Sequence, residues 1–120
     1  RRIAAALGPW AVSGPALEIG KRAFCDSAWI EQSRACLVTS ASLLDDVLRA
    51  GGLEPTGYSP LFRLVEHSSA TSVFQSLGDH GILVRNFSDQ PNRLRLGLPS
   101  DDVALAKIRL ALAASKVAVS

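Results

Sequence analysis

Residues 82–98 alternate between apolar and polar side chains. The even positions form one apolar face, made of Ile82, Val84, Leu94, Leu96 and Leu98. A period of two is typical of β-strands. The polar, proline-containing stretch 88–92 lies between the two apolar runs and is typical of a turn. The pattern therefore predicts a β-hairpin with one face on the core.

Helical spacing dominates the first fifty residues. Ser13 is typical of a helix N-cap, and a helix should follow it through about Phe24. A second helix is expected over residues 27–50, because Gly51 and Gly52 would end it. One stripe along it has helical spacing and contains Trp29, Ser33, Cys36, Leu37, Leu44, Val47 and Leu48. We expect this helix and residues 8–15 to pack against a missing domain or a second copy of the chain, and so to expose an apolar patch in the isolated chain.

After the two glycines the predicted elements become shorter. Residues 56–60 are expected to form a loop, residues 61–66 a strand, and residues 69–77 a short helix. Ser100 is expected to cap a final helix that runs to about Ala114, because two acids follow it at the positive end of the helix dipole.

The expected order is helix, helix, strand, helix, strand, strand, helix. This order predicts a two-layer α+β domain, in which a three- to four-stranded sheet has helices on one face. We expect two parts: a helical segment over residues 1–52 and a small α+β domain over residues 53–120.

Composition narrows the class of protein. The 120 residues are 48% hydrophobic and 20% charged, which is typical of one globular domain. A net charge of +2 with scattered basic residues gives no indication of nucleic-acid binding. No apolar run has the length needed to cross a bilayer, so no membrane partner is expected. Since the sequence contains no methionine, we expect a processed chain or part of a longer protein.

The second face of the predicted hairpin carries arginines. A five-residue loop would place Phe87 opposite Arg93, and Arg85 opposite Arg95. Like charges directly opposite each other destabilise a sheet, so this placement indicates an anion between them. Guanidinium groups match the paired oxygens of carboxylate and phosphate, and Gly97 would let a ligand approach the backbone. The hairpin is a candidate wall of an anion-binding site. The alternative is a solvated, arginine-rich surface.

The sequence offers no clear catalytic group beside this wall. His67 and His80 have no partner at metal-ligand spacing. Cys25 and Cys36 match no zinc or redox motif, and we expect both to be buried, reduced thiols. The lysines fall in predicted helices, at positions expected to be exposed: Lys21, Lys107 and Lys116. The sequence therefore predicts an anion-binding wall here, and we expect no catalytic residue or metal ligand.

Four segments together resemble a known enzyme family. They are "GPWAVSGPAL" (8–17), "PLFRLVEH" (60–67), "GILVRNF" (81–87) and "LRLGLPSDD" (94–102). The combination resembles the C-terminal small domain of fold-type I pyridoxal-phosphate enzymes, in the histidinol-phosphate aminotransferase-like group. Within that group it is similar to the threonine-phosphate decarboxylases of cobalamin (vitamin B12) biosynthesis.

The resemblance implies roles for the arginines. In the family, an arginine in a Leu-Arg-hydrophobic strand just before the last helix binds the substrate carboxylate, and the matching residue is Arg95. A shifted alignment would give this role to Arg93. The arginine of the "GILVR" motif, here Arg85, is implied to bind the phosphate or carboxylate of the substrate.

The resemblance also implies pyridoxal phosphate in the parent enzyme, a homodimer and a cytoplasmic location. In the family the cofactor lysine lies in a large domain, and we expect this chain to begin after it. Residues 1–52 would then join that domain, and the fragment alone would bind no cofactor and be inactive. Two alternatives are an aminotransferase fragment and a non-catalytic α+β module that binds carboxylates.

Overall fold

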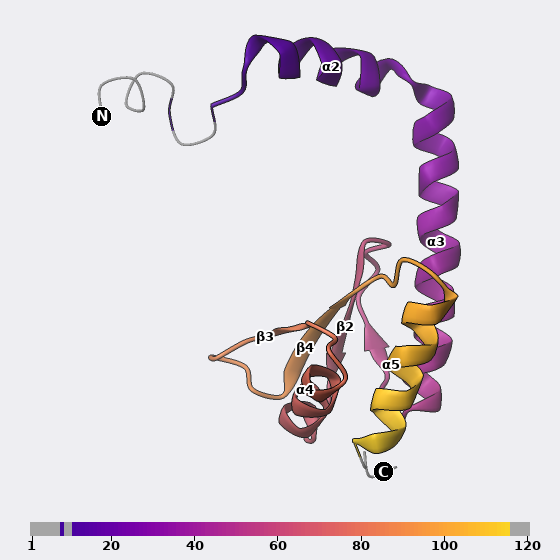
Figure 1. Cartoon of the computed structure of the whole chain (residues 1–120), viewed down its shortest axis with the longest axis vertical. Coiled ribbons are helices and arrows are strands. Elements are labelled where there is room, and N and C mark those ends of the chain that lie inside the picture. The colour runs from indigo at the N-terminus through magenta and orange to yellow at the C-terminus, as the bar shows by residue number, and fades with distance from the viewer. Residues whose placement is uncertain (1–7, 9–10, 116–120) are drawn as a thin grey trace. The chain divides into compact units, whose positions relative to one another are not determined.

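The computed structural model describes residue 8 and residues 11–115 (Figure 1). Trp10 and Lys116 lie outside the described residues. In chain order the elements are α2 (Gly14–Cys25), α3 (Ser27–Ala50), β1 (Pro55–Thr56), β2 (Phe62–Glu66), α4 (Ala70–Asp79), β3 (Arg85–Asn86), β4 (Arg93–Gly97) and α5 (Asp102–Ala114). None of the described helices is both long enough and apolar enough to span a membrane.

The chain divides into two compact units, Arg1–Ser33 and Arg34–Ser120, so the division falls within α3. The second half of α3 belongs to the second unit because Leu44, Val47 and Leu48 are buried in its core. The structural division thus lies before the expected boundary at residue 52. The boundary at residue 52 was expected between a helical segment that joins a large domain and the small α+β domain. It stays a prediction.

Side-chain caps explain where the first two helices begin. The Ser13 hydroxyl accepts a hydrogen bond from the Ala16 amide at 3.4 Å, and α2 follows it. Asp26 accepts from the Trp29 amide at 3.0 Å, where α3 begins. Both predicted helices are confirmed.

The expected burial of the two cysteines is wrong. Cys25 and Cys36 are both exposed, and the Trp29 side chain is 61% exposed. Among the described residues, α2 buries no side chain and α3 buries none before Ala41. Helical spacing alone could not show which turns of the stripe have a packing partner.

The second unit contains an antiparallel four-stranded sheet with strand order β1-β2-β4-β3 among its described residues. The central pair, β2 and β4, runs from Phe62 opposite Gly97 to Glu66 opposite Arg93. Helix α4 connects β2 to β3, which lies on the other side of β4. The predicted α+β class is confirmed.

Strand β1 was not predicted from the sequence, because Thr56 was expected to lie in a loop. Thr56 pairs with Leu64 of β2, and its hydroxyl donates to the Leu64 carbonyl at 3.2 Å. A strand of two residues shows no alternation that a sequence pattern could reveal.

The hairpin is shorter than expected. The Ile82 amide donates to the Leu77 carbonyl at 2.8 Å, so this segment completes the turn after α4 and does not extend β3. The ladder has the expected register but ends at the pair of Asn86 with Leu94, so the expected pairing of Phe87 with Arg93 is not part of it. The Gln90 amide donates to the Phe87 carbonyl, and the Arg93 amide donates to the Gln90 carbonyl, so the loop bonds within itself.

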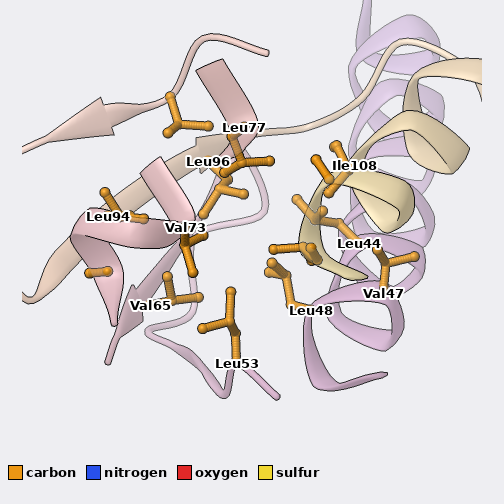
Figure 2. Close-up of a cluster of buried hydrophobic side chains, with 14 residues drawn as sticks. Leu44, Val47, Leu48, Leu53, Val65, Val73, Leu77, Leu94, Leu96 and Ile108 are labelled. Carbon is orange, nitrogen blue, oxygen red and sulfur yellow. The ribbon is translucent and has the colours of Figure 1, made fainter. Parts of the chain in front are cut away.

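One face of the sheet packs against helices (Figure 2). The core contains Leu44, Val47 and Leu48 from α3, Val73 and Leu77 from α4, Ile108 and Leu112 from α5, and Val65, Leu94 and Leu96 from the strands. Figure 2 shows Leu94 and Val65 on the sheet side of this cluster and Leu48 and Ile108 on the side of α3 and α5. The apolar face predicted for residues 82–98 is therefore the core face.

The cap of α5 is Asp101, and the expectation of Ser100 in this position is wrong. Asp101 accepts a hydrogen bond from the Ala104 amide at 2.8 Å. Ser100 instead donates its hydroxyl to the second carboxylate oxygen of Asp101 at 2.9 Å. The Ala104 amide, followed by the Ser100 hydroxyl, lowers the pKa of Asp101 below 3.8, because both stabilise the charged form.

Replacing Asp101 by alanine is expected to lower the free energy of unfolding at neutral pH, because the first turn of α5 loses its cap. A lowered folded-state pKa contributes stability above the ordinary value of 3.8, and this contribution disappears as the pH falls through the lowered value. Urea unfolding at several pH values should show the difference shrinking in acid. The Asp101→Asn control keeps a capping oxygen without the charge, so it should retain most of the parent's stability at neutral pH and should not share the parent's loss in acid. A pH-independent difference between Asp101→Ala and the parent would contradict the charged cap.

Candidate functional site

The candidate site lies on the open face of the sheet, away from the core. Strand pairing aligns Leu64, Arg95 and Arg85 in one row across β2, β4 and β3. The expected placement of Arg85 directly opposite Arg95 is confirmed. Two guanidinium groups therefore project from neighbouring strands on one face, where their repulsion favours an anion between them.

Arg63 belongs to the opposite, core side of the sheet, because it pairs with Leu96. Its Nε and Nη2 donate to the Asp45 carboxylate at 2.5 and 3.1 Å, and its Nη1 contacts the Ser59 carbonyl. The Arg63 and Asp45 side chains are only 12% and 17% exposed. This arginine therefore holds β2 on α3 and has its donors occupied.

Arg93 also has a carboxylate partner. Its Nη2 forms an ion pair with Glu66, which lies directly opposite on β2. Its Nε is buried without a hydrogen-bond partner among the described residues. The guanidinium of Arg93 therefore does not present an open pair of donors to a ligand.

Arg85 and Arg95 differ from these two arginines, because each has an aromatic ring as its neighbour. The Arg95 guanidinium carbon lies 5.2 Å from the centre of the Phe62 ring, and that of Arg85 lies 5.5 Å from the centre of the Phe87 ring. Within the described residues, neither arginine forms an ion pair with a carboxylate. Phe62 is not among the site residues that the sequence predicts. The signal was its even spacing with Leu64 and Glu66 on one face of β2.

A shallow pocket of about 630 Å³ lies over these arginines. Its walls include Phe62, Arg85, Arg95 and Gly97, together with the exposed side chain of Leu83. A Cβ atom added at Gly97 would meet no atom within 4 Å, so the space above this backbone is open. The pocket can therefore admit a small anion to the edges of both guanidinium groups.

The histidines serve local backbone structure. His67 Nδ1 accepts a hydrogen bond from the Ser69 amide at 3.1 Å, just before α4. His80 Nδ1 lies 2.8 Å from the Ser76 carbonyl at the end of that helix. In the described part of the chain, no group of three or more histidine, cysteine or acidic side chains could hold a metal ion.

The described lysines do not form a site for pyridoxal phosphate. Lys21 is exposed on α2, which buries no side chain. Lys107 is exposed on α5, and its Nζ lies 3.5 Å from the point where a Cβ of Gly81 would be. The pocket beside Lys107 is lined mostly by apolar residues and glycines of segments 81–84 and 96–100. It contains no acidic side chain that could pair with a pyridine nitrogen. The residues of this part of the chain do not fit the cofactor.

Two proteins of known function are similar to most of this chain. It is 37% identical over 110 residues to a threonine-phosphate decarboxylase of Pseudomonas aeruginosa. This alignment covers 92% of this chain and 33% of that protein. It is 38% identical over 107 residues to a threonine-phosphate decarboxylase of Sinorhizobium sp. That alignment covers 89% of this chain and 32% of the relative. The chain thus spans about a third of the length of these relatives. No protein-family model matches it.

A solved structure shows the same fold. This structure is of a protein described as an aminotransferase, from Burkholderia pseudomallei K96243. Its TM-score to this chain is 0.57, and the sequence identity is 20%. The similarity covers 68% of this chain and 26% of the other. At this identity the comparison concerns the fold alone. The resemblance predicted from the four sequence segments is confirmed by these comparisons: the chain fits a fragment of a threonine-phosphate decarboxylase with an aminotransferase fold.

Proposed function

We propose that this chain supplies the substrate-binding arginines of a pyridoxal-phosphate-dependent threonine-phosphate decarboxylase that acts in cobalamin biosynthesis. The observation that carries the proposal is the pairing of Arg85 with Arg95 on the open sheet face, with no carboxylate partner for either among the described residues. The similarity to two threonine-phosphate decarboxylases supports the choice of substrate.

O-phospho-threonine carries two anionic groups on one short carbon chain, and two adjacent guanidinium groups suit such a ligand. Arg95 binds the α-carboxylate through paired N–H donors, and Arg85 binds the phosphate. The ion pair between Arg93 and Glu66 favours Arg95 over Arg93 for the carboxylate. These contacts orient the substrate. The bond cleavage itself needs the cofactor, which residues outside this chain would hold.

The proposal extends to the rest of the protein. The relatives are about three times as long as this chain, which is consistent with a separate large domain that holds the cofactor. Residues 1–52 would join that domain, and the parent would be a cytoplasmic homodimer. The exposed Trp29 supports the proposal that the helix over residues 27–50 packs against that domain or a second copy of the chain. Leu17 and Phe24 of α2 are exposed apolar side chains as well. The fragment alone is expected to be inactive.

The test is an assay of the whole protein with O-phospho-threonine and added pyridoxal phosphate. We expect release of carbon dioxide and formation of an aminopropanol phosphate. Formation of a keto acid, or turnover of histidinol phosphate in its place, would support the aminotransferase alternative. Binding of carboxylates without turnover by any form of the protein would support the non-catalytic module.

A further inference from the structure

The Phe62 side chain lies on the open face of the sheet, where no side chain stands directly opposite it on β4. Its direct partner on β4 is Gly97, which has no side chain. Arg95 lies two residues earlier on β4 and is therefore the diagonal neighbour of Phe62. Diagonal neighbours across an antiparallel pair are within reach of aromatic and long side chains. The ring of Phe62 accordingly lies 5.2 Å from the Arg95 guanidinium carbon.

We propose that Phe62 is a positioning residue that holds the Arg95 guanidinium in its ligand-binding orientation. This inference rests on the proposed function, because it assigns to Arg95 the substrate carboxylate. The negative face of an aromatic ring attracts a guanidinium placed over it. That attraction opposes the repulsion between Arg95 and Arg85, which are directly opposite each other.

The contact with the Phe62 ring leaves the donors of Arg95 available, because Arg95 forms no ion pair within the described residues. A guanidinium has five N–H donors in a planar fork that matches two carboxylate oxygens, and one aromatic neighbour does not pair with them as a carboxylate would. The flexible side chain of Arg95 would otherwise lose conformational freedom when it binds a carboxylate. The Phe62 ring restricts it before the ligand arrives.

Phe62 does not contribute to the hydrophobic core. It is half-buried, lines the arginine pocket and stands outside the buried cluster that the helices form. Phe74 of α4 provides a contrast, because it is half-buried and packs against that cluster. A change at Phe62 should therefore affect ligand binding, whereas a change at Phe74 should affect stability.

The experiment measures ligand binding by titration calorimetry with the whole protein and its Phe62→Leu, Phe62→Tyr and Phe74→Leu variants. Pyridoxal phosphate is removed from all of them beforehand, so that the substrate is bound and not converted. The two ligands are O-phospho-threonine and aminopropanol phosphate, which has the phosphate but no carboxylate. Phe62→Leu should weaken binding of O-phospho-threonine by about two- to five-fold, the range expected for an exposed cation–π contact. It should leave aminopropanol phosphate unchanged, and Phe62→Tyr should bind both ligands like the parent.

A further variant tests whether Phe62 acts through Arg95. In an Arg95→Gln background, Phe62→Leu should cause no additional loss, because the cation that the ring positions is gone. Equal weakening of both ligands by Phe62→Leu, or no weakening, would overturn the inference while leaving the proposed function intact. If the unchanged protein does not bind O-phospho-threonine, the proposed function fails, and this inference fails with it.

Discussion

Replacing Arg95 by glutamine is expected to lower kcat/KM of the whole protein for O-phospho-threonine by about 100- to 1,000-fold. A hydrogen bond to a charged group contributes about 1.5–3 kcal/mol, and a guanidinium can make two such bonds to one carboxylate. Glutamine keeps part of the length of the side chain but loses the charge and the paired donors. Steady-state decarboxylation measured over a range of substrate concentrations would show the loss.

Arg93→Gln is the matched control. Arg93 is on the same strand and the same face, two residues before Arg95, but its guanidinium is paired with Glu66. Exposed ion pairs contribute about 0–1 kcal/mol, so we expect kcat/KM to change by less than about five-fold. A large loss in Arg93→Gln together with a small loss in Arg95→Gln would assign the carboxylate to Arg93 and support the shifted alignment.

Replacing Leu44 by alanine is expected to lower the free energy of unfolding by about 2–5 kcal/mol. Leu44 is fully buried on α3 and belongs to the cluster that joins this helix to the sheet and α5 (Figure 2). Truncation removes buried apolar surface and leaves a cavity that close packing cannot fill. Urea unfolding of the chain, followed by circular dichroism, would measure the change as a lower midpoint.

The neighbouring residue on the helix provides the control. Leu43 is 46% exposed, so Leu43→Ala removes much less buried surface and should shift the midpoint far less than Leu44→Ala. Similar shifts for both variants would mean that the second half of α3 does not pack on the sheet in solution.

Local signals predicted most of the helices and the orientation of the hairpin. Ser13 has a short hydroxyl that can satisfy the free amides of a first turn, and α2 begins directly after it. The alternation of Val84, Leu94 and Leu96 with arginines required one face to be buried, and all three are core residues. The same alternation placed Arg85 opposite Arg95, which strand pairing confirms.

Sequence patterns did not predict the hydrogen bonds within the loop after β3, the choice of cap for α5, or the packing partners of α3. The loop after β3 adopts internal hydrogen bonds through Gln90, which shorten the predicted hairpin. Asp101 and Ser100 are both good caps, and the choice between them depends on the path of the chain before α5. Helical spacing placed Trp29 and Cys36 on the same stripe as Leu44, although only Leu44 of these three is buried in the structure.

The sequence by itself determined the α+β class, the face of the hairpin that is buried, and the pair of arginines on the other face. These features depend on residues close together in the chain, whose spacing fixes the direction of each side chain. The tertiary structure decided which arginines are available to an anion. Asp45 lies 18 residues before Arg63, and Glu66 lies 27 residues before Arg93. Such distant charges meet only when α3, β2 and β4 pack together, and that packing leaves Arg85 and Arg95 with aromatic neighbours in place of carboxylates.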